Sequence, residues 1–346
     1  MSSKNIISVG GIQIGGGQRI TVQTMTNTNT EDIRSTVTQI REAVIAGCDL
    51  IRVSCPTKES AAALKEIVKQ SEIPIIADIH FDYKLALSAI KAGVHCIRIN
   101  PGNINIGLNE IIKSAKDNNV AIRIGVNSGS IEHDILDKHK KPNAEALVES
   151  AVRSCRRFEN LDFFNFKVSV KSSDVGTAIM AYRKLSKEID YPLHLGITEA
   201  GPVFSGMLKS AIGIGSLLVD GIGDTIRVSL SGSIVEEIKI GKQILKSLSL
   251  LENGVNIVSC PTCARALIDV VGIAEELEIY TANLKKSLKI SILGCVVNGP
   301  GEAAVADIGV FGFKTGLAKI YVNGIEYGLF EIDMILEEVK KIITNL

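Results

Sequence analysis

Short apolar segments alternate with amphipathic segments along the first 250 residues of the 346-residue chain. The amphipathic segments place apolar residues three and four positions apart, as at Ile33, Val37 and Ile40, which is typical of a helix packed on one face. Gly47 follows that segment and predicts a C-terminal cap. The apolar segments are short and rich in β-branched residues, which predicts buried strands. The predicted strands are Ile20–Gln23, Leu50–Ser54, Ile75–Asp78, Cys96–Asn100, Ala121–Val126, Phe164–Val168, Leu193–Ile197 and Thr225–Val228.

Eight predicted strands alternate with eight predicted helices, which favours an α/β fold of the closed (β/α)8 barrel type, about 250 residues long. An open doubly wound sheet is the alternative, but it normally has fewer units and a glycine-rich turn after its first strand. An internal echo supports repetition, since Ala46–Ser54 recurs as Ala92–Asn100. These two segments would carry the second and fourth strands of the TIM barrel.

Glycine is frequent before the first predicted strand, at Gly10, Gly11 and Gly15–Gly17. The stretch lacks the Gly-Lys-Ser/Thr ending of a nucleotide-binding loop. It therefore predicts a hairpin that plugs the floor of the barrel rather than a phosphate site.

Turn-forming residues at 251–254 indicate a boundary between a barrel of residues 1–250 and a smaller domain of residues 251–346. The smaller domain mixes strands with helices, so we expect an α+β unit. Its predicted elements are a strand at Val255–Ser259, a helix at Ala264–Glu278, a strand at Lys289–Leu293, a hairpin at Ile320–Tyr327 with an Asn-Gly turn, and a helix at Ile332–Ile343.

Charge is balanced, with 38 Lys and Arg against 38 Asp and Glu. This balance excludes a global electrostatic grip on nucleic acid or on an anionic membrane. The N-terminus lacks the apolar core of a signal peptide, and no apolar run reaches the roughly 18 residues of a membrane span. The cysteine count is seven, an odd number, which favours a reducing cytoplasm over a disulfide framework.

One motif recurs at predicted strand ends, an Ile-Arg pair followed by a β-branched residue. It occurs at Arg52, Arg98, Arg123 and Arg227, and Lys167 has the same place in a fifth strand. Because side chains alternate along a strand, these cations share one orientation, toward the barrel axis near its C-terminal mouth. Guanidinium groups suit phosphate oxygens, so the ring predicts an anion with several charges, such as a diphosphate. The alternative is that each cation pairs with an acidic neighbour.

Polar residues that follow other strands would contact the rest of such a substrate. The candidates are Asp78, His80, Asn100, Asn127 and Glu199. The alternative for each is a helix cap or a turn, the commoner role of Asp and Asn in these loops.

Three cysteines fall in the second domain: Cys260 and Cys263 form a Cys-x-x-Cys motif, and Cys295 opens a glycine-rich loop that reaches Glu302. A structural zinc site needs a fourth Cys or His, which this domain lacks. A redox pair fits a Cys-x-x-Cys that opens a helix, but it leaves Cys295 without a role. An iron–sulfur cluster with one non-Cys ligand is the third interpretation, and Glu302 is the nearest carboxylate. The spacing favours the cluster and leaves the other two open. The other four cysteines are expected to be small buried hydrophobic residues.

The motifs together resemble the hydroxymethylbutenyl diphosphate synthase family, reductive enzymes late in the methylerythritol phosphate route to isoprenoids. The resemblance spans nearly the whole chain. Its segments are Val22–Thr28 (VQTMTNT), Ala77–Tyr83 (ADIHFDY), Arg98–Ile104 (RINPGNI), Arg123–Ser130 (RIGVNSGS), Lys167–Lys171 (KVSVK), Gly196–Gly201 (GITEAG), Gly223–Ser229 (GDTIRVS), Cys260–Cys263 (CPTC) and Cys295–Glu302 (CVVNGPGE).

The resemblance implies a barrel followed by a small domain that holds a [4Fe–4S] cluster on Cys260, Cys263, Cys295 and Glu302. It implies methylerythritol cyclodiphosphate as substrate and hydroxymethylbutenyl diphosphate as product. The implied diphosphate-binding positions are Arg52, Arg98, Arg123, Lys167, Arg227 and Ser229. The implied positions near the carbon skeleton are Asp78, Asn127, Glu199 and Asn298.

The resemblance further implies a head-to-tail homodimer of the short bacterial form and two electrons delivered by flavodoxin or ferredoxin. Glu199 is the candidate proton donor, and substrate oxygen would displace Glu302. The residues alone leave two other classes open. One is a zinc- or disulfide-stabilised barrel that binds a pterin or a phosphorylated metabolite without redox chemistry. The other is a non-catalytic interaction protein.

Overall fold

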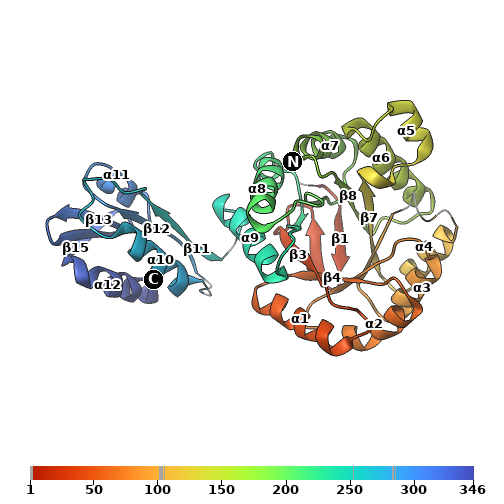
Figure 1. Cartoon of the computed structure of the whole chain (residues 1–346), viewed down its shortest axis with the longest axis horizontal. Helices are drawn as coiled ribbons and strands as arrows, with labels where there is room; N and C mark the ends of the chain where they lie inside the picture. Colours follow the sequence, from red (N-terminus) through yellow and green to blue (C-terminus); the bar gives the residue numbers. More distant parts are fainter. Residues whose placement is uncertain (1–2, 101–103, 105, 252, 283, 285) are drawn as a thin grey trace. The chain divides into compact units, whose positions relative to one another are not determined.

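In the computed structural model, the chain divides into two compact units, Met1–Leu250 and Leu251–Leu346 (Figure 1). The structure describes residues 3–100, 104, 106–251, 253–282, 284 and 286–346. Residues 101–103 of the predicted site segment at Arg98–Ile104 lie outside this part of the chain. No helix within the described residues is both long enough and apolar enough to span a membrane.

The first unit is the predicted TIM barrel. Its eight parallel strands follow the order β8-β7-β6-β5-β4-β3-β10-β9, and a bridge between Val168 and Leu193 joins β8 to the segment before β9 and closes the ring. The strands are β3 (Thr21–Met25), β4 (Leu50–Ser54), β5 (Ile75–Asp78), β6 (Cys96–Ile99), β7 (Ala121–Asn127), β8 (Phe166–Lys171), β9 (His194–Leu195) and β10 (Thr225–Ile226).

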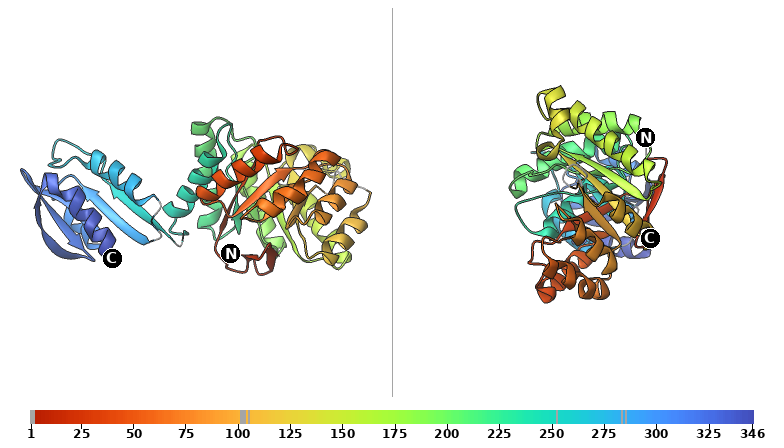
Figure 2. Two further views of the ribbon diagram at one scale, coloured as in Figure 1. Left: turned by 90° about the horizontal axis from the view of Figure 1, so that it is seen from below. Right: turned by 90° about the vertical axis from the view of Figure 1, so that its right-hand side faces the viewer.

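Helices surround these strands (Figures 1 and 2). Several begin where a short polar side chain accepts a hydrogen bond from a backbone N–H of the first turn, as Asp32, Thr57 and Asn143 do. The helices are α1 (Ile33–Ile45), α2 (Lys58–Gln70), α3 (Tyr83–Lys91), α4 (Leu108–Asp117), α5 (His133–His139), α6 (Ala144–Asn160), α7 (Val175–Glu188), α8 (Val203–Val219) and α9 (Ile234–Ser247), with a 3-10 turn at Ser128–Ser130.

A hairpin of β1 (Ile6–Val9) and β2 (Ile12–Gly15) lies at the floor of the barrel. Ile7, Val9 and Ile14 pack against the first inward residues of four strands: Leu50, Ile76, Cys96 and Ala121. The predicted floor hairpin is therefore confirmed. Its apolar side chains exclude water from the end of the barrel opposite the mouth.

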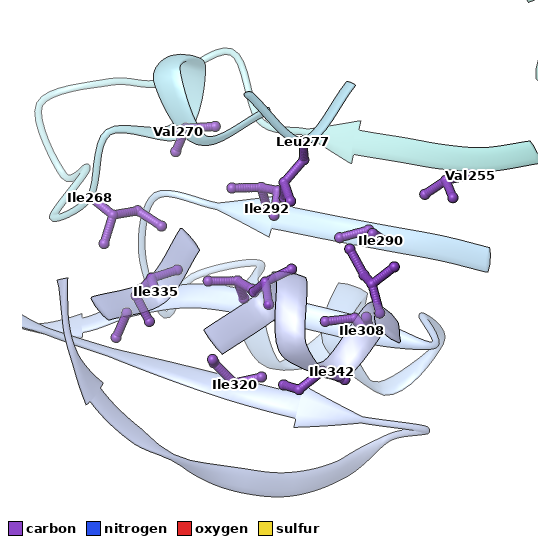
Figure 3. Packing of buried hydrophobic residues seen from close by; sticks show 14 residues of the cluster. Val255, Ile268, Val270, Leu277, Ile290, Ile292, Ile308, Ile320, Ile335 and Ile342 are labelled. Atoms are coloured by element: carbon purple, nitrogen blue, oxygen red, sulfur yellow. The ribbon is translucent and has the colours of Figure 1, made fainter. Parts of the chain in front are cut away.

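The second unit is a five-stranded sheet of order β11-β12-β13-β14-β15, in which the first three strands run parallel and the last two pair antiparallel. Helices α10 and α12 bury one face, where isoleucines of β12 and β13 meet Leu277 and Ile335 (Figure 3). The elements are β11 (Gly254–Ser259), α10 (Val270–Thr281), β12 (Ser287–Leu293), α11 (Gly299–Ala304), β13 (Ile308–Lys314), β14 (Leu317–Val322), β15 (Ile325–Glu331), a 3-10 turn at Ile332–Met334 and α12 (Ile335–Asn345).

Two predictions for this unit need correction. The helix expected from Ala264 begins at Val270, because Asp269 caps it by accepting from the Gly272 backbone N–H. Cys263 consequently lies in the loop before the helix and does not open it. The sequence analysis also missed α11 and β13, whereas the Asn-Gly hairpin is confirmed, with φ of 51° at Asn323 and 76° at Gly324.

The floor hairpin supplies a test of packing. Ile14 is fully buried against the strand starts, whereas Ile6 on the paired strand is 52% exposed. We expect Ile14→Ala to lower the free energy of unfolding of the barrel by about 2–5 kcal/mol, because it leaves a cavity. Ile6→Ala should cost less than about 1 kcal/mol. Urea unfolding measures both, and equal losses would contradict a packed floor.

Candidate active site

A row of charged side chains crosses four adjacent barrel strands. Asp78, Arg98, Arg123 and Lys167 are partners in register on β5, β6, β7 and β8. All four are buried, and Lys167 is fully so. This row lies inside the barrel, where the sequence predicted the cations. A TIM-barrel interior is usually filled by branched apolar residues, so three adjacent cations there need a specific reason.

Asp78 is the carboxylate that balances this end of the barrel. Its oxygens lie 3.4 Å from Arg98 Nη1, 3.8 Å from Arg52 Nε and 3.3 Å from His80 Nε2. Burial alone would raise the pKa of Asp78, but Arg52, His80, Arg98 and Arg123 hold it well below its usual range. Asp78 is therefore ionised and orients the arginines on either side of it.

The cations exceed the acceptors that surround them. Arg98 Nε, Arg123 Nε and Nη1, Arg227 Nε and Lys167 Nζ are buried and have no hydrogen-bond partner among the described residues. Arg52 donates from Nε and Nη2 to the Met25 sulfur, a weak acceptor, at 3.0 and 2.9 Å. Buried donors without acceptors are costly, so the arrangement fits a ligand that brings several anionic oxygens.

Two glycines make room for this crowding. A Cβ on Gly125 would come within 2.5 Å of Arg98 Nε, and a Cβ on Gly196 would come within 2.6 Å of Lys171 Nζ. Gly125 therefore keeps space for the Arg98 guanidinium, whereas at Gly196 the backbone carbonyl of Arg227, also 2.6 Å away, excludes a side chain beside Lys171.

Lys171 is a site residue that the sequence analysis left without a role. It ends β8 on the same side of the strand as Lys167. Burial and the nearby Arg123, Arg227, Arg52 and Arg98 lower the pKa of Lys171 well below its usual value. The expected strand at Phe164–Val168 stopped too early, and for that reason Lys171 was overlooked.

Lys167 has a different environment. Burial lowers the pKa of Lys167 to about 8, and its neighbours include the buried thiol of Cys96, which belongs to the floor cluster. Lys167 therefore lies among deeper neighbours than Lys171, toward the floor of the barrel.

Arg227 follows β10 and lies 3.8 Å from Glu237 of α9. Glu237 is buried, and it accepts hydrogen bonds from Thr24 Oγ1 at 2.6 Å and from the Leu230 backbone N–H at 2.9 Å. Burial lowers the pKa of Arg227 to about 10, with Arg52 as the next cause. Glu237 thus orients Arg227, and one of two adjacent acids in the first turn of an amphipathic helix gave no signal of this in the sequence. Ser229, two residues further, is half-buried.

The polar candidates occupy the same mouth. With its amide oxygen turned toward Arg98, Asn127 accepts from Arg98 Nη2 at 3.2 Å and donates to the Val126 carbonyl at 3.1 Å. Glu199 is exposed after β9 and has φ of +52°, a left-handed conformation that a non-glycine residue adopts at a cost. Asn100 is buried, and His80 reaches Asp78.

The cysteines fall into two groups. Cys48, Cys55, Cys96 and Cys155 are buried in the barrel, as expected of small apolar residues. In the second unit, Cys260 and Cys295 follow β11 and β12, neighbouring parallel strands whose carboxyl ends meet at one edge of the sheet. Cys263 is exposed in the loop after β11, and Glu302 lies in α11 with Asn298 just before it.

Three free thiols and a carboxylate fit an iron–sulfur cluster by their chemistry. The Gly294 backbone N–H donates to Cys260 Sγ at 3.2 Å, a bond of the type that tunes cluster thiolates. Among the described residues, however, no three His, Cys, Asp or Glu side chains converge closely enough to hold a metal ion. The structure brings Cys260 and Cys295 to one edge of the sheet, and it does not bring the candidate ligands to coordination distance.

Comparisons with known proteins agree with this architecture. The family model for the GcpE TIM-barrel domain matches residues 4–242, and that for the GcpE protein C-terminal domain matches residues 256–345. A relative from Clostridium acetobutylicum is 50% identical over 344 residues, which cover 98% of each chain. A relative from Rhodospirillum rubrum is 54% identical over 326 residues, which cover 92% of this chain and 85% of the relative. Both relatives are named 4-hydroxy-3-methylbut-2-en-1-yl diphosphate synthase (flavodoxin).

Solved structures share the barrel alone. 3-Dehydroquinate dehydratase from Geobacillus kaustophilus has a TM-score of 0.53 at 16% identity, covering 72% of this chain and 100% of that chain. Dihydropteroate synthase from Yersinia pestis has a TM-score of 0.52 at 11% identity, covering 71% of this chain and 100% of that chain. At such identities the likeness concerns the fold and not the activity. The two family models and the near full-length relatives together show that the chain belongs to the GcpE family of 4-hydroxy-3-methylbut-2-en-1-yl diphosphate synthases.

Proposed function

We propose that this protein catalyses the reductive ring opening of methylerythritol cyclodiphosphate to hydroxymethylbutenyl diphosphate. The reaction takes up two electrons and protons, breaks the ring bond between carbon and phosphate oxygen, and releases a hydroxyl group as water. The buried cations of the barrel mouth, which have more donors than nearby acceptors, are the observation that carries the proposal. Membership of the GcpE family supports it. A pterin-binding barrel is not favoured, since the likeness to dihydropteroate synthase concerns the fold alone.

The barrel binds the diphosphate. Arg52, Arg98, Arg123, Arg227 and Ser229 offer donors from four strands, and Asp78 and Glu237 hold three of the arginines in place. Preorganised donors stabilise the negative charge that grows on the phosphate oxygens as the ring opens. The floor hairpin keeps water from the opposite end.

We propose that Lys171 also contacts the diphosphate. Lys167 lies deeper in the barrel, and we propose that it adds positive charge there without contacting the substrate. The four arginines near Lys171 support its contact with substrate. Asn127 and Asn298 orient the carbon skeleton. Glu199 is the proposed proton donor, because it follows β9 at the mouth of the barrel in a strained backbone conformation.

Cys260, Cys263, Cys295 and Glu302 would hold the [4Fe–4S] cluster. Such a cluster supplies one-electron redox chemistry and, at the iron that lacks a thiolate, an exchangeable coordination position. The chain contributes the thiolates, the carboxylate and the hydrogen bond from the Gly294 N–H to Cys260.

The partners follow from this chemistry. Flavodoxin, named in the relatives, is the proposed electron donor, and ferredoxin is the second candidate. We propose a head-to-tail homodimer in the cytoplasm, where three free thiols remain reduced.

Anaerobic turnover tests the proposal directly. The purified protein, reconstituted with iron and sulfide, is mixed with methylerythritol cyclodiphosphate and dithionite. Mass spectrometry should detect hydroxymethylbutenyl diphosphate. Full cluster content without any product would refute the proposed activity.

Variants of the two lysines of β8 distinguish a lysine that contacts the substrate from one that lies deeper in the barrel. We expect Lys171→Met to raise KM by about tenfold to a hundredfold, the usual effect of losing a charge-assisted hydrogen bond. Lys167→Met should change KM by less than about threefold. Steady-state kinetics with dithionite measures both, and the reverse order would assign substrate contact to Lys167.

The shifted pKa of Lys167 also predicts that the free energy of unfolding depends on pH. Burial lowers its pKa to about 8 from 10.5, so below pH 8 the proton favours the unfolded chain. Lys167→Met should therefore raise the free energy of unfolding by about 3 kcal/mol near pH 7. This gain should shrink as the pH rises from 8 toward 10.5. Urea unfolding of both proteins checks it, and a gain independent of pH would show that Lys167 keeps its ordinary pKa inside the barrel.

Cluster ligation is tested by Cys263→Ser, with Cys55→Ala, a buried barrel cysteine, as the control. The wild type and the control should bind about four irons per chain after anaerobic reconstitution. Cys263→Ser should lose most of this iron together with the visible absorption. Unchanged circular dichroism would show that the variant is folded, and wild-type iron content in it would remove Cys263 from the ligand set.

A further inference from the structure

In the second unit, α10 and α12 cover one face of the sheet. On the other face, α11 packs against β12 and β13 through Ala303, Leu293 and Phe311. On this other face, β13, β14 and β15 place Phe311, Lys319 and Leu329 in one row. Leu329 is 45% exposed, and Phe313, Lys319 and Tyr321 are half-buried. We call Phe313, Lys319, Tyr321 and Leu329, with Lys314 at their border, the aromatic face.

The aromatic face is continuous with the candidate cluster ligands. Leu293, Ala303 and Phe311 form a small buried cluster beneath it, and Cys260, Phe313 and Tyr321 all pack against that cluster. The rings of Phe311 and Tyr321 have centroids 5.5 Å apart. Packed side chains therefore connect Cys260 to this surface.

Cations border this face. Lys319 Nζ lies 4.5 Å and Lys314 Nζ 5.4 Å from the centre of the Phe313 ring. Two acids offset them on the same face: Glu326 pairs with Lys319 at 2.7 Å, and exposed Glu331 lies across from Leu317, the β14 partner of Lys314. The helical face of the unit differs, because its acids outnumber its bases, although Lys340 and Lys341 pair with Glu337 and Glu338. Its acids on or beside α10 and α12 are Asp269, Glu275, Glu276, Glu278, Asp333, Glu337 and Glu338.

We propose that the aromatic face is the docking surface for the electron-donor protein, an acidic carrier with an exposed flavin edge. An apolar centre with a border of balanced charge, next to the candidate cluster ligands, suits the small, transient interface of an electron-transfer complex. The acids of α10 and α12 repel the same carrier from the helical face. The inference rests on the proposed function, since it assumes that electrons enter at the cysteines of this unit.

Charge changes of opposite sign test this docking. With the full-length reconstituted protein and oxidised flavodoxin, Lys314→Glu should weaken binding about tenfold at low ionic strength. Glu326→Gln should tighten it about threefold, because it frees Lys319. The control is Lys341→Glu on α12, whose side chain is 62% exposed, and it should leave the Kd unchanged. Isothermal titration calorimetry measures the Kd, and stopped-flow measures the rate of reduction by reduced flavodoxin.

Each outcome of these measurements supports or overturns the docking surface or the proposed function. Slower reduction of Lys314→Glu by flavodoxin, with normal reduction by dithionite, supports the docking surface. An unchanged Kd in Lys314→Glu and Glu326→Gln, or equal weakening by Lys341→Glu, overturns it. A shift in oligomeric state at an unchanged Kd would assign the face to a second copy of the chain and would equally overturn it. Absence of product with dithionite in the wild type refutes the proposed function instead, and the measured Kd still reports on docking.

Discussion

Repulsion among buried cations governs the barrel. Arg98, Arg123 and Lys167 are cross-strand neighbours in the interior, and Asp78 balances one end of their row. A packed apolar floor, capped outer helices and glycines that leave room for the cations hold these groups in place despite the repulsion. The buried donors without acceptors thus lower the stability of the empty barrel. An anion with several oxygens removes this cost on binding, because it accepts hydrogen bonds from them.

Much of the barrel could be predicted from the sequence. β4 and β5 have the predicted bounds, because each is a short β-branched segment between turn residues. The Ile-Arg motif also predicted which side chains face the interior, because alternation along a strand is a property of the backbone. The start of β8 was misplaced, since Phe164 looks like a strand residue but is 54% exposed. Because the predicted strand ended at Val168, Lys171 fell outside it and was given no role.

The second unit was harder to predict. α11 has only six residues and contains Pro300 and two glycines, so its apolar periodicity is too short to recognise. Cysteine spacing indicates a chemistry but no arrangement, because the edge that gathers Cys260 and Cys295 depends on the parallel pairing of β11 with β12. Glu237 was overlooked for a similar reason, since only the packing of α9 beside β3 gives its carboxylate a partner.

The ring of strands has a seam where β8 meets β9. The bridge between Val168 and Leu193 joins them, flanked by hydrogen bonds from Val168 N to the Pro192 carbonyl and from Thr198 N to the Ser172 carbonyl. Lys171 ends the strand on one side of this seam, and Arg227 follows the strand beyond its other side. In the proposed function, a diphosphate bound by both cations would link the two sides of the seam. Part of its binding free energy then becomes rigidity of the barrel, and slower amide exchange at the seam would report the occupied mouth.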